Sequence, residues 1–223
     1  MKMKSGFRRL DAMLGGGLPA GTNILLSGGP GTGKTLFSLK FLLEGLKAGE
    51  KCCYITLSEN RDELLRAAEN IESLKDIRNH LSRKLAIEHI ELGENITMKR
   101  FNEVISSYPA IDRLVIDNIN KLLIHTESKK SYRIHLAELL KHLKSISRCT
   151  LLICETSEDS IDTGNGEAFE CDGVMQLSFL EFEEKPMRIL QIHKLRYTSF
   201  EPKTPHELTI SAKDLNLADT KII

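Results

Sequence analysis

An eight-residue segment, GGPGTGKT at 28–35, combines residue types that suit one kind of chemistry. Its glycines allow the backbone to adopt positive φ and to approach a ligand closely, so that consecutive N–H groups can point at phosphate oxygens. Lys34 offers a positive charge, and Thr35 offers a hydroxyl that can ligate Mg²⁺. The spacing matches the pattern G-x-x-x-x-G-K-[ST]. The segment therefore predicts a cradle for nucleotide phosphates, formed by Gly28, Gly29, Pro30, Gly31, Thr32, Gly33, Lys34, Thr35 and Leu36.

The residues on either side of this segment predict the two elements that a phosphate-binding loop joins. TNILLS at 22–27 is a short apolar run between glycines, which is typical of a buried strand. After the loop, Gly49 can end an amphipathic helix whose apolar face is formed by Leu36, Leu39, Leu43 and Leu46. The loop would then lie at the positive N-terminal end of this helix, where phosphate binds favourably.

Three carboxylates follow other apolar runs and are candidates to bind the metal or to activate water. In open α/β sheets, ligands bind beyond the carboxyl ends of the strands. Asp117 ends the run RLVID, and we expect it to reach Mg²⁺ through the metal's water shell; the alternative role is a turn or helix cap. Glu59 follows the run YITL and is the first candidate to orient or deprotonate water, and Glu155 is the second. Both glutamates could instead be capping or loop carboxylates.

The order of the remaining segments predicts an α/β fold. Strand-like runs alternate with helical patterns as far as residue 154: strands at 52–57, 85–92, 113–117 and 149–154, and helices at 61–71, 97–107 and 131–147. This alternation is typical of a parallel sheet with right-handed crossovers. After Cys171, three further runs leave no room for crossover helices: 173–182, 187–195 and 206–211. We therefore expect a mostly parallel central sheet flanked by helices, with antiparallel strands added by the C-terminal part.

Length and composition limit the class of protein. The 223 residues suit one domain spanning 1–223, and the 31 basic and 31 acidic residues create no global field toward nucleic acid or an anionic membrane. No apolar run approaches the ~20 residues of a membrane span, and the N-terminus lacks the apolar core of a secretory signal. We therefore expect a cytoplasmic protein. Its five cysteines show no C-x-x-C spacing, which favours reduced, structural thiols.

Several segments, in order, resemble the KaiC-like branch of the RecA superfamily of P-loop ATPases. They are SGFRRLDAMLGGGLPAG with the loop that follows it, YITLSEN, VIDN, AFECDGVMQL and ILQIHKLRYTS. The resemblance extends from residue 5 to about residue 217, and the segments LGGGLPAG and KLRYTS are its most specific parts. It implies a RecA-like core that binds ATP and Mg²⁺. Because the chain has one such domain, it resembles the single-domain homologues common in archaea rather than the two-domain clock proteins.

The resemblance also implies that ATP binds at a subunit interface of a homo-oligomeric ring, often a hexamer. The neighbouring subunit would then place Lys194 and Arg196 of the KLR segment on the γ-phosphate. A cation supplied in this way stabilises charge on the transferred phosphoryl group, as an arginine finger does. The alternative is that the two side chains pair with carboxylates of their own chain.

The sequence departs from the family pattern at three places. The family usually has two consecutive glutamates after the second strand, whereas this chain has Ser58 and Glu59, and serine alone cannot act as a base. Phe200 stands where the family commonly has a histidine. The phosphate-accepting pair of the clock proteins aligns with Ala168 and Phe169, which offer no acceptor. The resemblance therefore predicts tight Mg·ATP binding with slow hydrolysis, with Glu59 as the substitute base.

Three functions remain open from the sequence. The first is a slow Mg-dependent ATPase or ATP-dependent regulatory switch, and the second is a nucleotide sensor that does not hydrolyse ATP and acts on a protein partner that the sequence does not name. The third is a recombinase-like DNA-binding protein. The segment 155–172 argues against nucleic acid, because it has seven acidic residues, no Lys, Arg or His, and Phe169 as its one aromatic.

Overall fold

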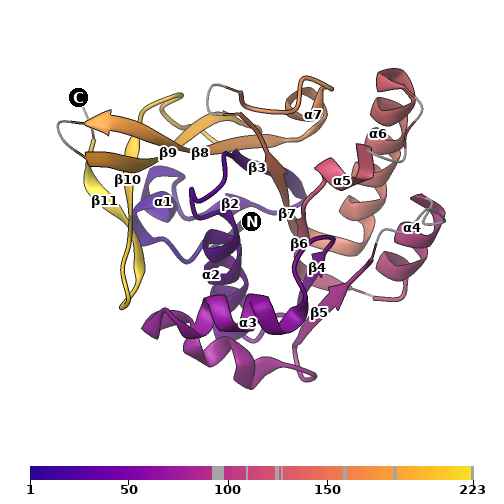
Figure 1. Ribbon diagram of the computed structural model, residues 1–223, viewed down its shortest axis with the longest axis horizontal. Coiled ribbons are helices and arrows are strands. Elements are labelled where there is room, and N and C mark those ends of the chain that lie inside the picture. The colour runs from indigo at the N-terminus through magenta and orange to yellow at the C-terminus, as the bar shows by residue number, and fades with distance from the viewer. Residues whose placement is uncertain are drawn as a thin grey trace.

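The computed structural model describes residues 1–91, 98–108, 110–123, 126, 128–157, 160–182 and 185–221. Its main feature is a nine-stranded sheet in the order β11-β10-β9-β8-β3-β7-β6-β4-β5 (Figure 1). The strands of this sheet are β3 (Thr22–Gly28), β4 (Cys52–Thr56), β5 (Leu85–His89), β6 (Ile111–Asp117), β7 (Ser147–Glu155), β8 (Gly173–Phe182), β9 (Lys185–Leu195), β10 (His206–Ile210) and β11 (Leu215–Lys221).

The directions of the strands confirm the predicted mixed sheet. Strands β8, β3, β7, β6, β4 and β5 pair in parallel, whereas β9, β10 and β11 extend the sheet beyond β8 by antiparallel pairing. Strand β3 is central, with β7 on one side and β8 on the other. The segment 28–35 therefore leaves the carboxyl end of a strand that is held on both edges.

Helices cover both faces of the sheet (Figure 1). The helical elements are α1 (Arg8–Met13), α2 (Lys34–Lys47), α3 (Arg61–Glu69), the 3-10 helix η1 (Glu72–His80), α4 (Met98–Ser106), α5 (Asn120–Leu123), α6 (Lys129–Ile146) and α7 (Glu167–Glu170). Alternate residues of each central strand pack into two separate cores. In β3, Ile24 and Leu26 face the core that contains α1, α2, α3 and η1, whereas Leu25 faces the core of α4 and α6.

The predicted strand at 85–92 is too long, because β5 ends at His89, and Leu92 lies outside the described residues. Helix 97–107 is found as α4 at Met98–Ser106, with residue 97 outside the description. The sequence patterns missed seven short or terminal elements: β1 (Lys2–Met3), β2 (Leu18–Pro19), α1, η1, α5, α7 and β11. Most are too short for a periodic pattern, and tertiary contacts stabilise them: before α1, for example, the Phe7 ring stacks on Phe37 at 4.4 Å.

The five cysteines are free and buried, as expected for structural thiols. Burial raises the pKa of Cys52 and of Cys53 to about 12, so neither thiol ionises readily. Within the described residues, no helix combines the length and the apolar character that a membrane crossing needs.

Candidate nucleotide site

The surroundings of the phosphate-binding loop constrain the glycines at which it begins and ends. Gly28 has φ +152°, and a Cβ atom there would overlap the carbonyl oxygen of Leu177 on β8. Gly33 has φ +102°, and a Cβ atom there would lie 2.7 Å from Cδ1 of Ile210 on β10. Strands β8 and β10 therefore lie close against the loop: a side chain at Gly28 would overlap the backbone of β8, and the positive φ at Gly33 favours glycine.

The loop delivers the chain to the N-terminus of α2. Because the N-cap residue is Gly33, no N-cap side chain occupies the N–H groups of the first turn. The hydroxyl of Thr32 donates instead to the carbonyl oxygen of Gly29, at 2.9 Å, which closes the loop on itself. These N–H groups lie at the positive end of a 14-residue helix, an arrangement that can bind an anion.

Lys34 lies inside this loop. Its Nζ atom donates to the carbonyl oxygens of Gly28 and Gly29, at 2.9 and 2.8 Å, and the side chain is buried. Burial lowers the pKa of Lys34, and the negative charges of Glu155 and Asp117 oppose this shift. The ammonium group is therefore held where a phosphate could replace two carbonyl acceptors.

Asp117 and Thr35 meet at the carboxyl end of β6. The Thr35 hydroxyl lies 3.5 Å from Oδ2 of Asp117, and the hydroxyl of Tyr54 donates to the same oxygen at 2.5 Å. Burial raises the pKa of Asp117, whereas the hydrogen bond from Tyr54 lowers it. The described residues contain no group of three or more His, Cys, Asp or Glu suited to a metal. A single carboxylate beside a hydroxyl nevertheless fits Mg²⁺, which usually keeps several waters and shares the phosphates of its substrate.

Ser58 and Glu59 lie in a turn that a threonine side chain holds. The Thr56 hydroxyl accepts from the N–H groups of Ser58 and Glu59 at 3.2 and 3.0 Å, and donates to the carbonyl oxygen of Glu59 at 2.7 Å. Because Thr56 pairs with Asp117, this turn lies at the same sheet edge as the loop. Desolvation raises the pKa of Glu59, and so do the nearby charges of Asp117, Glu63 and Glu155.

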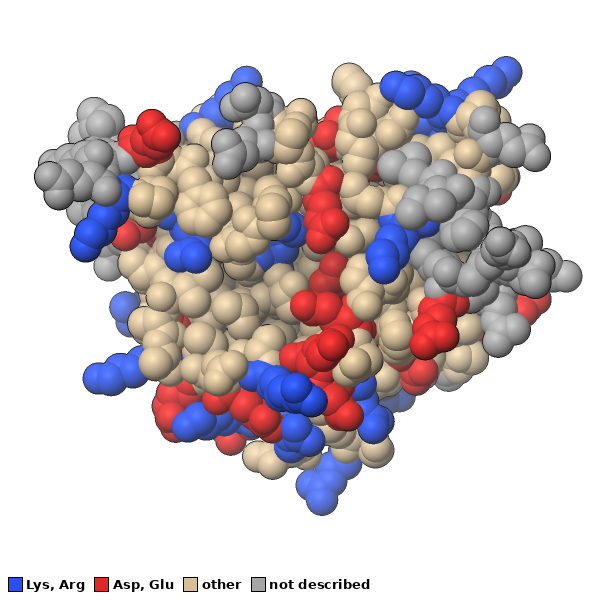
Figure 2. Space-filling view, viewed as in Figure 1, with Lys and Arg blue, Asp and Glu red and all other residues tan. Residues whose placement is uncertain are grey.

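Glu155, the second candidate, is the last residue of β7 and lies beside the loop. It pairs with Gly28 across the sheet, and its backbone exchanges hydrogen bonds of 2.7 Å with the side chain of Asn120. Figure 2 shows acidic side chains gathered in a band over the region where β6, β4 and α3 lie in Figure 1. Carboxylates therefore surround Lys34 at the carboxyl edge of the sheet.

Lys194 and Arg196 lie at the opposite end of the strands from the phosphate-binding loop. Lys194 pairs with Val174 on β8, and the Arg196 N–H donates to Asp172, whose own N–H donates to Asn23 at the start of β3. Asn23 and Gly28 are separated along β3 by about 16 Å at the usual strand rise. The two cations therefore cannot reach the loop of their own chain.

Both cations have partners within the chain. Lys194 Nζ donates to the carbonyl oxygens of Ala168 and Phe169, each at 2.9 Å, at the C-terminal end of α7. Arg196 lies 3.4 Å from the buried carboxylate of Asp172, which also pairs with Lys144 at 2.8 Å. Half of the Arg196 side chain is exposed, at 50%.

Arg188 is a second cation that contacts the loop, besides Lys34, and the sequence motifs did not single it out. Its Nε atom donates to the carbonyl oxygen of Gly31 at 3.1 Å, and its guanidinium lies 5.2 Å from the ring centre of Phe179. The two residues pair across β8 and β9. Only the antiparallel pairing of these strands brings Arg188 to the loop, and no local pattern in the sequence signals it.

Basic residues from another element lie beside the acidic segment 155–172, and the composition of the segment alone does not indicate them. Phe169 is 74% exposed and lines a cavity of about 560 Å³ together with three basic residues of α6: Lys129, Lys130 and Arg133. In Figure 2 basic side chains gather over α6 at the upper right. Arg133 pairs with Glu170 at 2.9 Å, and Asp162 also lines the cavity. Glu158 and Asp159 lie outside the described residues.

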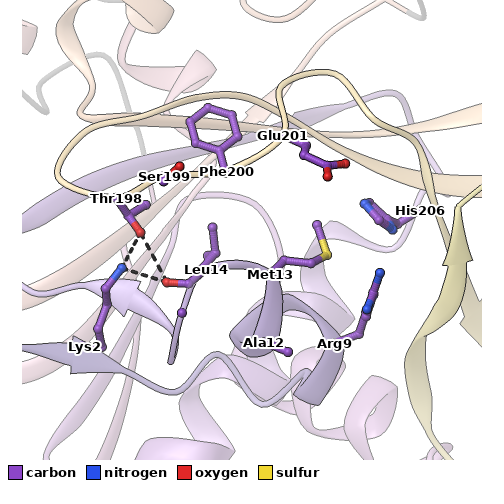
Figure 3. A pocket seen from close by; sticks show the side chains of 11 residues that line it. Lys2, Arg9, Ala12, Met13, Leu14, Thr198, Ser199, Phe200, Glu201 and His206 are labelled. Carbon is purple, nitrogen blue, oxygen red and sulfur yellow. Dashed lines mark hydrogen bonds between the residues drawn. The ribbon is translucent and has the colours of Figure 1, made fainter.

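A second cavity, of about 740 Å³, lies between α1 and the turn that follows Arg196. Lys2 donates to the Leu14 carbonyl and to Thr198 at one side of it, and Figure 3 shows the Arg9 guanidinium directed across it toward His206 and Glu201. None of residues 28–36 lines this cavity. Cavity size alone therefore does not mark the phosphate-binding loop in this chain.

The strand order around β3, with the glycine loop and α2 at its carboxyl end, defines a P-loop core of the RecA type. The chain belongs to the KaiC family of ATPases, because the family model "ATPase: KaiC" matches residues 3–221. It is similar to a crystal structure of a KaiC-like protein from Pyrococcus horikoshii, with a TM-score of 0.84, 27% identity and coverage of 98% of this chain and 99% of that one.

Two curated relatives agree with this assignment. A UPF0273 protein of Pyrococcus horikoshii is 27% identical over 100% of this chain and 96% of the relative. The circadian clock oscillator protein KaiC of Synechococcus elongatus is 29% identical over 97% of this chain. The chain spans 44% of the length of that clock protein.

Proposed function

We propose that the chain binds Mg·ATP and hydrolyses it slowly, as a weak ATPase or an ATP-dependent switch. The observation that carries this proposal is the buried Lys34 inside a glycine loop, at the N-terminus of α2 and beside the Thr35–Asp117 pair. The family assignment supports ATP as the nucleotide. Carboxylates surround the site, so a bound triphosphate would need a cation to offset the repulsion.

Each residue of the site has a role that follows from its contacts. Lys34 would exchange the carbonyl oxygens of Gly28 and Gly29 for β- and γ-phosphate oxygens. Thr35 and Asp117 would hold Mg²⁺, the latter through water; the ion neutralises phosphate charge when bound. Glu59 would orient the attacking water, and its raised pKa suits a general base better than that of an ordinary glutamate. Ser58 offers no second carboxylate, which is why we expect turnover to be slow.

Lys194 and Arg196 would act on the nucleotide of a neighbouring copy in an assembled ring. Their position at the far end of the strands excludes the loop of their own chain, which favours action in trans. Lys194 would have to leave the carbonyl oxygens of Ala168 and Phe169 to reach a γ-phosphate. Arg196 is half exposed, and it would leave the carboxylate of Asp172 to reach a phosphate. Asp172 would still be paired with Lys144.

Equilibrium binding of ATP to the wild type, Lys34→Ala and Lys84→Ala tests the proposal. Lys84 is the matched control, because its Nζ atom also donates to a loop carbonyl, that of Gly49, at 2.7 Å. Two charge-assisted hydrogen bonds are worth enough to make Lys34→Ala bind ATP about 100-fold more weakly. Lys84→Ala should bind as the wild type does. A wild-type protein with no affinity for any nucleotide would sink the proposal.

A nucleotide sensor without turnover is the second candidate, and the replacement of a glutamate by Ser58 favours it over an efficient ATPase. Analysis of the bound nucleotide after several hours separates the two functions, because a sensor would still contain ATP. A DNA-binding function is less well supported: the basic residues beside Phe169 are accompanied by Asp162 and by the Arg133–Glu170 pair.

A further inference from the structure

Tyr54 is buried directly beneath the proposed metal site. Its side chain is fully buried, and its hydroxyl donates to Oδ2 of Asp117 at 2.5 Å. Strands β4 and β6 pair so that Tyr54 is opposite Val115, and Asp117 is the diagonal neighbour two residues further on. A diagonal neighbour on the same face lies within reach of a long aromatic side chain. The sheet register therefore determines this contact.

The contact leaves one carboxylate oxygen of Asp117 available. Tyr54 donates to Oδ2, and the Thr35 hydroxyl lies 3.5 Å from the same atom. Among the described residues, none donates to Oδ1. The terminal torsion of an aspartate is broad and soft, so a strong donor on one oxygen decides where the other points.

We propose that Tyr54 is a positioning residue for the metal: its hydroxyl anchors Oδ2 of Asp117, so that Oδ1 faces the water shell of Mg²⁺. This inference rests on the proposed function, because it assumes that Asp117 serves a nucleotide-bound metal. It extends that function to a residue outside the phosphate-binding motif. The Thr35 hydroxyl donates its proton to Oδ2 at 3.5 Å, so the lone pairs of its oxygen could ligate the ion.

Tyr132 provides a matched control within the same chain. It is also buried, and its hydroxyl donates to a buried carboxylate, Oε1 of Glu167, at 3.0 Å. Tyr132 lies on α6 and Glu167 on α7, and neither is among the candidate metal ligands Thr35 and Asp117. Tyr54→Phe and Tyr132→Phe therefore remove the same hydroxyl group from the same kind of pair, at the metal site and away from it.

The test is a titration of Mg²⁺ into protein with a fluorescent ATP analogue, followed by analogue affinity in excess EDTA. Outer-shell partners of a metal site typically contribute 10- to 100-fold in metal affinity. Tyr54→Phe should raise the half-saturating Mg²⁺ concentration severalfold, up to about tenfold, because Tyr54 holds a carboxylate that would itself meet the ion through water. Its affinity for the analogue in EDTA should remain within about twofold of the wild type, because the phosphate-binding loop is intact. Tyr132→Phe should change neither quantity.

A second measurement separates positioning from a general loss of structure. If Tyr54 acts through Asp117, the Tyr54→Phe substitution should have no further effect on Mg²⁺ dependence in an Asp117→Asn background. Equal Mg²⁺ dependence of Tyr54→Phe and the wild type would overturn the inference, as would an equal loss of affinity in EDTA. Failure of the wild type to bind the analogue would instead refute the proposed function, and it would be seen before any substitution is made.

Discussion

The phosphate-binding loop and the Lys194–Arg196 segment are two basic regions at opposite ends of the central strands. At the loop, Lys34 is held by the loop's own carbonyl groups, and the sheet fixes the loop at Gly28 and Gly33. At the other end, Lys194 and Arg196 are bonded to groups that have no part in the loop, namely the end of α7 and Asp172.

The difference between the two regions lies in what completes them. The loop, α2 and Asp117 come together within one chain, because neighbouring parallel strands bring their carboxyl ends to one edge. Lys194 and Arg196 can meet a phosphate only if another copy presents its own loop to them. In the proposed function, one region is therefore a preformed site, and the other would contribute only through assembly.

Mixing two inactive variants gives the largest effect and tests this division directly. Removal of both cations, in Lys194→Ala with Arg196→Ala, should lower ATP turnover by about 1,000-fold, as for the loss of an arginine finger. Lys34→Ala should also be inactive. A mixture of the two variants should recover activity. The subunit that lacks the two cations supplies an intact loop, and its Lys34→Ala neighbour supplies Lys194 and Arg196.

Lys144→Ala is the control for the mixing experiment. It removes another cation from the same carboxylate, Asp172, without touching the segment expected to act in trans. Turnover by Lys144→Ala should stay close to that of the wild type. A loss in the cation variant that no mixture restores would show that the two residues act within their own chain or only support the fold.

Ser58→Glu should raise turnover by about tenfold to 100-fold, within the range of general base catalysis. Ser58 is exposed in the turn that Thr56 holds at the sheet edge, so a longer side chain can be accommodated there. Ser58→Gln is the control, because it has the same length and lacks a base. A steady-state phosphate-release assay measures both, and an equal rate increase in the two variants would contradict a base at this position.

Sequence patterns indicated the loop and Asp117 more readily than the contacts that depend on the tertiary fold. The loop and Asp117 are local patterns: residue spacing places them, and parallel pairing then brings them together. Arg188 and Tyr54 could not be recognised in this way. Arg188 reaches Gly31 only through the β8–β9 pairing, and Tyr54 reads from the sequence as one more apolar residue of a buried strand. The basic surroundings of Phe169 likewise come from α6, far away along the chain.

The pH dependence of kcat/KM sharpens the role of Glu59. Desolvation and the charge of Asp117 raise the pKa of Glu59, so its active, ionised form is lost at a higher pH than for an ordinary glutamate. As the pH falls below this pKa, kcat/KM should drop about tenfold per unit. Glu59→Gln should lower the maximal value of kcat/KM and abolish its decrease at low pH, the acid limb of the profile.

Glu63→Gln is a matched control for the acid limb. Glu63 is one of the charges that raise the pKa of Glu59, and glutamine preserves the capping box at the start of α3. The limb should move to lower pH in this variant, while the maximal value of kcat/KM stays the same. An acid limb that survives Glu59→Gln unchanged would assign the titrating group to another residue.

The smallest expected effect is a change in the fluorescence emission of a tryptophan introduced into either region. Such reporters compare the phosphate-binding loop with the Lys194–Arg196 segment in the same protein. The chain contains no tryptophan, so each reporter is the single source of indole fluorescence. Phe179 stacks with Arg188 beside the loop, so Phe179→Trp should respond to both ATP and ADP. Phe169 accepts a hydrogen bond from Lys194, so Phe169→Trp should respond to ATP, when Lys194 moves to a γ-phosphate, and not to ADP.

Dilution distinguishes the two reporters further. The Phe169→Trp signal should disappear at concentrations where the assembly dissociates. It should also disappear when the same chain carries the second substitution Lys194→Met. Both changes remove the contact between Lys194 and the nucleotide of the neighbouring subunit. The Phe179→Trp signal should persist in both cases, because that reporter senses the loop of its own chain. A Phe169→Trp response that survives dilution to monomer would place the movement of Lys194 within a single chain, and the contrast between a preformed and an assembled half of the site would then be wrong.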